Sequence, residues 1–569
     1  MRENRELGKA LIHKGANRLF PFAHRLSLVA ALLTTLTWIE DLPAQNRLLP
    51  GLNEKSFYKE VSRPPGIGPD RELEREGARI GDIHIDAANI FDTRKPEENT
   101  RLFRLGNRLH IKTRDDTIRQ YLLFRSGDRY QGRLLAESER LLRQRQYLHD
   151  ASIRPVRRHD GVVDIEVKTT DVWTLKPGIS FGRSGGENTS GVEIEEINLL
   201  GTGSSINLSS RNGVDRSSLS FFYRNPTLAH SWWDLSFGYS DNSDGKSGAF
   251  TLQRPFYALD TRTAGGVSWR EFDRRESRYD LGRIVDQFFV DEKSINLEYG
   301  WSPGFISGWT SRYRIGFKID DNRFQAIDSG TTLLPPDRRL YYPYLSWERR
   351  EGKYHKDHNR NQISRTEDIA LGWRMNATIG YAAPVFGADR ESVILASTLR
   401  HGNLFSENRS LTWRASASAR HEHGHWANAL LGGRLQYHHH QSARRTFYLS
   451  FGADAASRLD IDRQLLLGGD NGLRGYPLRY QSGKGRWLFT AEQRYFSHWY
   501  PFRLFNVGGA IFADLGKTWG KTDVPGVQLG LLRDIGFGLR LGNARSGLGS
   551  VIHLDLAFPL DGTDDIESV

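Results

Sequence analysis

The chain has 569 residues, a mean hydropathy of −0.56 and a formal net charge of +11. So polar a chain is not a helical membrane protein, because each membrane helix needs about 20 predominantly apolar residues. Cysteine is absent, which excludes disulfides, thiol nucleophiles and thiolate metal sites. The 79 Lys and Arg residues are interspersed with 68 Asp and Glu residues, so no basic tract predicts a nucleic-acid partner, and none is expected.

Residues 1–44 have the organisation of a secretory signal peptide. Several basic residues, the last of them Arg25, precede an apolar run at 26–39, and the small residue Ala44 follows. The apolar run is too short to span a bilayer as a helix. An uncleaved anchor or a start codon assigned too early is the alternative.

The next two segments differ in composition and in their pattern of apolar residues. Residues 45–75 are polar and contain the breaker cluster RPPGIGPD, which predicts a linker. Residues 76–172 predict a small α+β domain in the order strand, helix, helix, strand, strand. The longer helix contains RLLAESERLLRQRQYL, whose leucines share one face, and the last two strands form a hairpin that turns at Asp160-Gly161.

From residue 173 to 560, apolar and polar residues alternate with a period of two. In DIGFGLRLG, Ile535, Phe537 and Leu539 share one face, whereas glycines and Arg540 share the other. A soluble β-sandwich also alternates, but its outer face would be strongly polar. An apolar face opposite a mixture of Gly, Arg, Asp and Asn suits a barrel with lipid outside and water inside. We therefore predict an all-β transmembrane barrel.

About nineteen segments have this strand pattern, among them IALGWRMNATIGY at 369–381. Bacterial single-chain barrels have an even number of strands. Either some segments are hairpins within loops, or one strand is missing. Tryptophans and tyrosines near strand ends, as in HSWWDLSFGY and RYFSHWYPF, predict an interfacial aromatic girdle.

One loop stands out, in the stretch LLLGGDNGLRGYPLRY. Its Arg474 is framed by the glycines Gly469, Gly472 and Gly475. A flexible loop with one arginine suits a segment that folds into a narrow polar space and meets a carboxylate there. On the two strands that follow, Glu492 and Asp514 lie on the polar faces, so both carboxylates are expected to point into the lumen.

Three motifs in this order, GGDNGLRGY, TAEQRYF and FADLGKTWG, resemble the barrel signature of the BamA/TamA superfamily of outer-membrane assembly and translocation proteins. This superfamily also contains the transporters of two-partner secretion. The α+β segment at 76–172 resembles its periplasmic POTRA domain. The resemblance covers most of the chain and implies a barrel of sixteen strands, whereas the strand count from the sequence is nearer 18–20.

The resemblance also implies roles for individual residues. Arg474 is the loop arginine that folds into the lumen, and its motif comprises Gly469, Leu473, Arg474, Gly475 and Tyr476. Asp514 is its expected partner, and Glu492 is the second. A simple hairpin register places the two carboxylates several residues apart in height, so Asp514 is the preferred partner. The alternative is that Arg474 only stabilises the structure and takes no part in transport.

Two features depart from the family pattern. Only one POTRA-like domain is recognisable. The chain also finishes with LAFPLDGTDDIESV, without a final strand closed by an aromatic residue, and residues 561–569 are expected to form a polar tail. We therefore expect a poorly paired seam between the first and last strands.

The implied function is insertion of proteins into the bacterial outer membrane, or translocation of polypeptide across it, with the N-terminal domain in the periplasm. The implied partners are unfolded or partly folded outer-membrane or secreted polypeptides and outer-membrane lipid, with room for periplasmic accessory proteins. No enzymatic activity and no cofactor are expected. A dedicated two-partner-secretion exporter and a passive porin-like channel are the alternatives.

Two weaker motifs are interpreted as structural rather than functional. GRSGG at 182–186 matches the nucleophile motif G-x-S-x-G around Ser184, but it lies at a strand-end turn without the strand–turn–helix frame of such enzymes. The histidine runs at 421–425 and 438–440 cap opposite ends of one predicted strand, so they cannot form one metal site, and both are interpreted as solvated turns.

Overall fold

The structure is a computed structural model that describes residues 63–561, except 328–330, 332, 364, 523–528, 544 and 548–550. The predicted signal peptide at 1–44, the linker residues 45–62 and the tail residues 562–569 lie outside the described residues. None of the helices within the described ranges is both long and apolar enough to cross a bilayer.

The N-terminal part of the described chain is a small α+β module (residues 70–171). Its elements are α2 Asp70–Arg75, β1 Arg79–Ala88, η3 Pro96–Glu98, α3 Arg101–Leu109, α4 Asp115–Arg119, α5 Gly132–Arg143, β2 Leu148–His159 and β3 Val162–Asp171. The sheet order is β1-β3-β2, with β1 parallel and β2 antiparallel to β3. The predicted hairpin turn is present, since Asp160 and Gly161 both have positive φ.

The module has its own hydrophobic core. Leu135 and Leu142 of the apolar stripe of α5 lie in one buried cluster with the β3 residues Val163 and Ile165. Leu73 of α2 is fully buried in the same core. Residues 70–75 were expected to be irregular, and that expectation is wrong because the buried Leu73 recruits α2 into the module.

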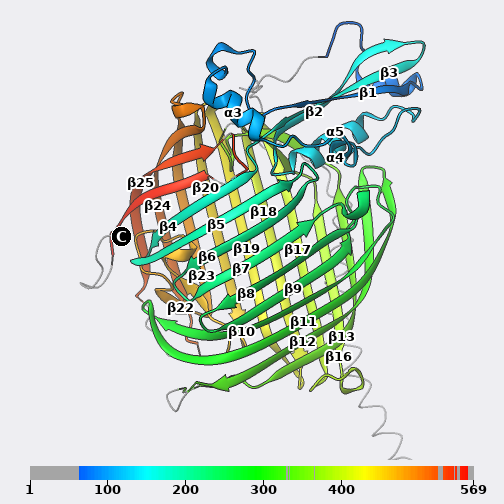
Figure 1. Cartoon of the computed structure of the whole chain (residues 1–569). Coiled ribbons are helices and arrows are strands. Elements are labelled where there is room, and N and C mark those ends of the chain that lie inside the picture. Colours follow the sequence, from blue (N-terminus) through cyan, green and yellow to red (C-terminus); the bar gives the residue numbers. More distant parts are fainter. Residues whose placement is uncertain are drawn as a thin grey trace, which may run out of the picture. The chain divides into compact units, whose positions relative to one another are not determined.

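The rest of the chain forms a closed β-barrel, whose nineteen strands within the described residues are arranged in sequence order (Figure 1). The strands are β4 Leu175–Ser184, β5 Glu187–Leu199, β6 Ser204–Asn212, β7 Ser217–Asn225, β8 Asp234–Asn242, β9 Gly245–Arg254, β10 Thr263–Asp280, β11 Arg283–Ile306, β12 Trp309–Ala326, β13 Arg338–Glu351, β16 Arg374–Ala382, β17 Ser392–Ser406, β18 Arg409–Glu422, β19 His425–Ser442, β20 Arg445–Ser457, β23 Gly485–Phe496, β24 Phe505–Trp519, β25 Leu531–Asn543 and β26 Val551–Pro559. The barrel and the strand count from the sequence are confirmed. The sixteen strands implied by resemblance and the expected even number do not hold for these residues.

The barrel wall is apolar outside. Phe537 lies opposite Ile511 on β24 and Leu556 on β26, and all three side chains are exposed. The same alternation turns Arg540 inward, where it is buried. A soluble protein rarely exposes a continuous apolar belt, so the outer face is suited to lipid.

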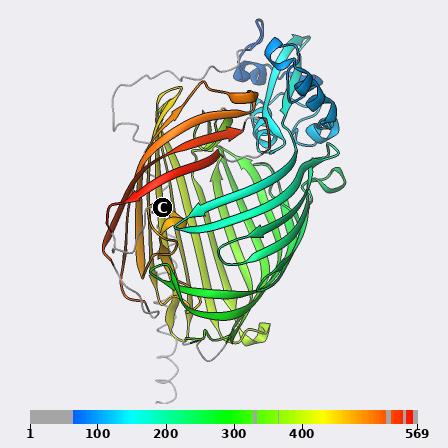
Figure 2. The same cartoon turned by 60° about the vertical axis from the view of Figure 1, so that its left-hand side comes forward.

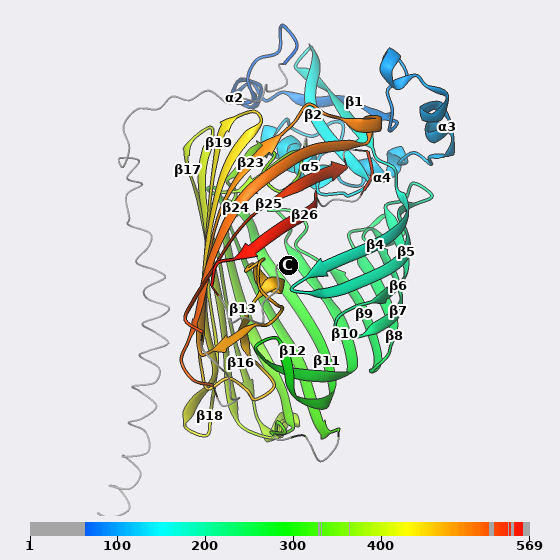
Figure 3. The same cartoon turned by 90° about the vertical axis from the view of Figure 1, so that its left-hand side faces the viewer.

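The odd strand number determines how the barrel closes. Every neighbouring pair with a defined register is antiparallel. Because nineteen is odd, β4 and β26, which are neighbours in the closed order, run in the same direction. Figures 2 and 3 turn this junction toward the viewer, with β26 in red and β4 in teal.

We call the end of the barrel where β4 begins the module rim, and the opposite end the loop rim. At the module rim, the segment before β4 pairs with the turn between β25 and β26. Trp173 donates its backbone N–H to the carbonyl oxygen of Arg545 (2.7 Å) and accepts from the N–H of Gly547 (3.1 Å). The expected weak seam depends on residues 562–569 and stays a prediction.

An insertion separates β13 from β16 at the module rim. This rim insertion (residues 352–373, without 364) contains the hairpin of β14 Tyr354–His358 and β15 Thr366–Ala370. The single strand expected at 369–381 is therefore wrong. Its start belongs to β15, and barrel pairing of this segment begins only at Arg374.

Candidate functional site

The arginine loop (residues 458–484) joins β20 to β23 from the loop rim. It contains the paired short strands β21 Leu465–Leu467 and β22 Gln481–Gly483 and the turn η6 Gly469–Asn471. Gly472 has φ of 119°, a conformation that residues with a side chain rarely adopt. A Cβ at Gly475 would lie 2.8 Å from Cβ of Asp534 and 3.0 Å from the backbone nitrogen of Pro559. Glycine at 475 therefore lets the loop backbone touch the barrel wall.

Arg474 reaches the inner faces of three strands. Its Nε and Nη2 donate to the two carboxylate oxygens of Asp514 on β24, over 2.8 and 3.1 Å, in a forked geometry. Its Nη1 donates to Asp555 on β26 (3.1 Å) and to Glu492 on β23 (3.5 Å). The guanidinium carbon also lies 3.3 Å from the centroid of the Phe512 ring, a cation–π arrangement.

The predicted residues Arg474, Asp514 and Glu492 are thus brought together by the structure. Glu492 lies opposite Phe512 and Asp514 opposite Thr490, so the two carboxylates are offset by two residues rather than several. Sequence reasoning did not single out Asp555. Its inward position in VIHLDLAF was the one available signal.

Two more arginines complete what we call the lumen cluster, which comprises Arg474, Arg494, Arg540, Glu492, Asp514 and Asp555. Arg494 and Arg540 each donate to Oε1 of Glu492 over 3.1 Å. Arg540 also bonds Asp555. The charges of the cluster are mutually compensated, which is what a buried ionic group requires.

The other motif residues fix the loop tip. Leu473 is fully buried in a cluster with Leu467 and Leu532. The hydroxyl of Tyr476 lies 2.8 Å from the carbonyl oxygen of Arg533 on β25 and 2.7 Å from that of Asp561, which follows β26. Its single proton can be donated to either carbonyl. Asp561, expected in a free polar tail, is therefore held by the loop tip.

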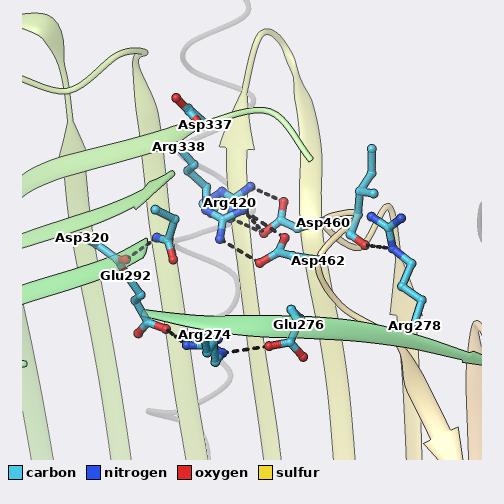
Figure 4. A network of polar contacts seen from close by, with 12 residues as sticks. Arg274, Glu276, Arg278, Glu292, Asp320, Asp337, Arg338, Arg420, Asp460 and Asp462 are labelled. Carbon is cyan, nitrogen blue, oxygen red and sulfur yellow. Dashed lines mark hydrogen bonds and ion pairs between the residues drawn. The ribbon is translucent and has the colours of Figure 1, made fainter. Parts of the chain in front are cut away.

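The stem of the arginine loop is held by a second set of ion pairs, shown in Figure 4. Both carboxylate oxygens of Asp460 accept from Arg420 on β18, over 2.6 and 2.8 Å. Asp462 accepts from Arg338 on β13 with two bonds of 3.2 Å. Arg338, Arg420 and Asp462 are among the residues that line an interior cavity of about 490 Å³. Sequence reasoning missed all four residues.

The rim insertion contacts the α+β module. Arg143 of α5 donates to both oxygens of Asp368, over 2.8 and 2.6 Å, and both side chains are buried. Arg365 donates to the backbone oxygens of Leu148 and His149 on β2. The insertion therefore covers the start of the β2 edge.

The same insertion reaches the barrel interior. Arg360 donates to Ser410 and Thr412 on β18, over 2.8 and 3.2 Å. Asp357 lies 2.8 Å from Nε2 of His440 on β19. Burial raises the pKa of Asp357, but the hydrogen bond with His440 and the charge of Arg360 outweigh it and lower this pKa to about 2. Asp357 is thus a charged anchor.

Other turns of the module rim also contact the module. The carboxylate of Glu137 accepts from the backbone N–H of Leu259, over 2.8 Å. The Trp232 ring stacks on Tyr257 at 3.8 Å and meets the edge of Tyr121. For Trp232, the expected place in an aromatic girdle is wrong, because its ring packs between the barrel and the module.

The weaker motifs are resolved as follows. Ser184 ends β4 at a turn with positive φ at Gly185 and Gly186. The turn of the first histidine run is formed by His423 and Gly424. In the second run, His438 and His440 are buried, so its interpretation as a solvated turn is wrong. Among the described residues, no group of three or more His, Cys, Asp or Glu side chains could hold a metal ion.

Comparison with known proteins gives matches only among solved structures. No protein-family model matches the sequence, and no curated protein matches it. The chain is similar to BamA from Haemophilus ducreyi lacking POTRA domains 1–3, with 13% identity and a TM-score of 0.36, over 86% of this chain and 83% of that one. It is also similar to CdiB from Acinetobacter baumannii (14% identity, TM-score 0.43, 87% and 72% of the two chains) and to CdiB from Escherichia coli (13%, 0.45, 87% and 75%).

Proposed function

We propose that the protein is a bacterial outer-membrane barrel that inserts outer-membrane proteins or carries polypeptide across that membrane. Residues 76–172 would act as its periplasmic POTRA-like domain. The observation that carries the proposal is the position of Arg474, which ties a loop from one rim to carboxylates on β23, β24 and β26. The motif resemblance points to the same activity.

A passive channel is less well supported. The arginine loop crosses the interior, and its stem is tied to β13 and β18 through Asp462 and Asp460. A channel that only passes solutes does not require a loop fixed at both stem and tip. A protein that must open for a polypeptide can use such a loop as a removable internal support.

The module has an open stretch of sheet edge along β1. The start of the β2 edge is covered, since Arg365 and Arg143 bond the carbonyls of Leu148 and Ala151. Ile83–Ala88 of β1 pair with β3 on one side. On the other side of β1, Gly127 bonds Ile80, but within the described residues no second strand pairs with Ile83–Ala88. An extended client could add there as a further strand, because edge pairing uses backbone groups whatever the client sequence.

Photo-crosslinking in living cells tests this proposal. A photoreactive residue at His84 or Asp86, both exposed on β1, should capture unfolded outer-membrane or secreted polypeptides. The matched control is Arg157, exposed on β2 at the opposite edge of the same sheet. Captured clients that later fold in the outer membrane indicate insertion, and clients recovered outside the cell indicate a dedicated exporter. Steady ion conductance without any captured client would contradict the proposal in favour of a porin.

A further inference from the structure

Helix α3 of the module has one face fixed to the protein. Phe103 is buried, and its ring stacks on Phe91 with centroids 4.3 Å apart. The side chain of Asn107 bonds both the backbone N–H and the carbonyl oxygen of Phe91, over 3.1 and 2.8 Å. At the start of the helix, Thr100 accepts from the backbone N–H of Phe103 (3.2 Å). These contacts fix the orientation of α3, so that its other face points outward.

The outward face is apolar. Leu102, Leu105, Leu109 and Ile111 are 70, 48, 63 and 53% exposed. The three leucines follow the spacing of neighbouring positions on one helical face. Four large aliphatic side chains left in water on one short segment form an unusual surface for a soluble module.

The same segment is strongly basic. Between residues 101 and 112 there are four Lys or Arg residues and no Asp or Glu. These are Arg101, Arg104, Arg108 and Lys112, and all four are exposed. Leucines on one face with long cationic side chains beside them are typical of helices that lie in the plane of a membrane interface. The cationic groups can then extend to lipid phosphates while their stems cover apolar surface.

The location of α3 agrees with this character. The Phe91–Phe103 pair packs against Trp173, just before β4, and Leu504, just before β24. These are positions at the module rim, where the apolar outer faces of two barrel strands begin. In the turn that contains Leu504, Trp499 and Phe502 are 66 and 79% exposed. Exposed aromatic residues at a barrel rim are typical of the lipid–water interface.

We infer that α3 is a membrane-surface anchor of the module. Its leucines enter the acyl region of the leaflet next to the module rim, and its Arg and Lys side chains bind anionic phospholipid headgroups. This inference rests on the proposed outer-membrane location. A bilayer is favoured over a protein partner because α3 packs beside the starts of two barrel strands whose outer faces are apolar, and because the uniform positive charge complements phosphate.

Single-cysteine variants provide the test, since the chain has no native cysteine. Spin labels would be placed at Leu105→Cys and Leu109→Cys in the full-length protein, in nanodiscs of phosphatidylethanolamine and phosphatidylglycerol. The matched controls are Leu539→Cys on the outer face of β25 and His84→Cys on β1, both exposed. Labels at 105 and 109 should be several-fold more accessible to oxygen than to a water-soluble nickel chelate, as at 539, with the opposite preference at 84.

The controls separate the possible failures. Water-exposed labels at 105 and 109 together with a lipid-exposed label at 539 overturn the anchor but leave the barrel's location intact. Labels at 105 and 109 that become shielded from both reagents only in native membranes indicate a protein partner and also overturn it. A water-exposed label at 539 overturns the proposed location and the anchor together.

Changing the charge of the lipid tests whether the Arg and Lys side chains of α3 bind anionic headgroups. In nanodiscs of phosphatidylcholine alone, the oxygen preference at 105 and 109 should fall, while that at 539 should not change. The double variant Arg101→Gln/Arg108→Gln should reproduce this fall in the anionic nanodiscs. If neither change alters the signal at 105 and 109, the headgroup contact is contradicted.

Discussion

Arg494 of β23 donates a hydrogen bond to the backbone carbonyl oxygen of Arg360 in the rim insertion, over 2.8 Å. Arg494 also bonds Glu492, which Arg474 contacts from the arginine loop. Two segments that enter the barrel from opposite rims therefore end on one cluster. Because Asp368 of the insertion is bound by Arg143 of the module, a continuous series of polar contacts joins the module to the loop tip.

Removing Arg474 should destabilise the closed arrangement of the loop. Arg474→Ala leaves the buried carboxylates of Asp514 and Glu492 short of positive charge, and breaking such a pair costs roughly 3–5 kcal/mol, less where water enters. Arg474→Lys should restore only part of this, because an ammonium group cannot form the fork. Asp514→Ala should have a similar effect, and the double variant should be less than additive. Thermal unfolding, followed by heat-modifiable gel migration, measures the effect.

The matched control for this prediction is Arg479→Ala. Arg479 is an arginine of the same loop that pairs with the more exposed Asp215, both bonds being 2.7 Å. Exposed pairs contribute about 0–1 kcal/mol. Equal losses of stability for the two arginine variants would contradict a special role of the lumen cluster.

Breaking the contact between Arg143 and Asp368 should free the rim insertion. Asp368→Asn removes the charge from a buried forked pair, and we expect the hairpin β14–β15 to open more often by at least tenfold, the equivalent of about 1.4 kcal/mol. Hydrogen exchange of residues 354–370 measures this. Glu166→Gln, which affects the half-exposed pair with Arg154, is the control. Unchanged exchange in Asp368→Asn would show that the insertion is held by the barrel alone.

Neutralising the stem of the arginine loop should change ion selectivity. Asp460→Asn/Asp462→Asn leaves Arg338 without its two carboxylate partners and leaves Arg420 with Glu422 alone, beside the interior cavity. Two fewer negative charges should shift the reversal potential in a salt gradient toward anions, and the loosened stem should raise conductance in planar bilayers. Asp241→Asn, at an exposed position of β8, should change neither quantity. A reversal potential that stays at the parent value contradicts the assignment of these carboxylates to the conducting interior.

Acid should weaken the module where it meets the rim insertion. Burial, with the charges of Arg365 and Arg545, lowers the pKa of His149 from 6.5 to about 4. Above pH 6.5 the imidazole is neutral in both folded and unfolded protein, so it adds no pH dependence. As the pH falls from about 6.5 to 4, only the unfolded chain gains the proton, and the folded state loses about 3 kcal/mol of stability.

The variant His149→Gln isolates this effect, because glutamine does not titrate. Burial also raises the pKa of Asp150, which acts in the opposite direction, since acid then favours the folded state. Thermal unfolding of parent and variant between pH 7 and pH 4 should therefore differ in slope, with the variant less acid-sensitive. If the stability of the parent and of the variant changed equally with pH, His149 would not be neutral and buried in the folded protein.

The sequence predicts features that depend on local pattern. Alternation around Phe537 and Arg540 predicts both the barrel and its inward face. The meeting of Arg474 with Asp514 and Glu492 is implied by the resemblance of the loop motif to a known family. Contacts between distant segments carry no such pattern. Asp460 meets Arg420 and Arg338 only because the barrel curves β13 and β18 toward the loop stem. The second strand of the rim insertion hairpin, β15, was missed because its alternation continues into that of β16 across Gly372.

The hydroxyl of Tyr476 couples the position of the loop tip to the end of β26. It bonds the backbone of Arg533 near the start of β25 and of Asp561 just after β26, while the neighbouring Arg474 contacts the carboxylates of the lumen cluster. Because the two residues are only two positions apart, the loop tip cannot withdraw far and leave the bonds of Tyr476 intact. Loop withdrawal and fraying of the end of β26 would then share one kinetic barrier. A client that displaces the loop would, in the same step, meet a freshly released strand end.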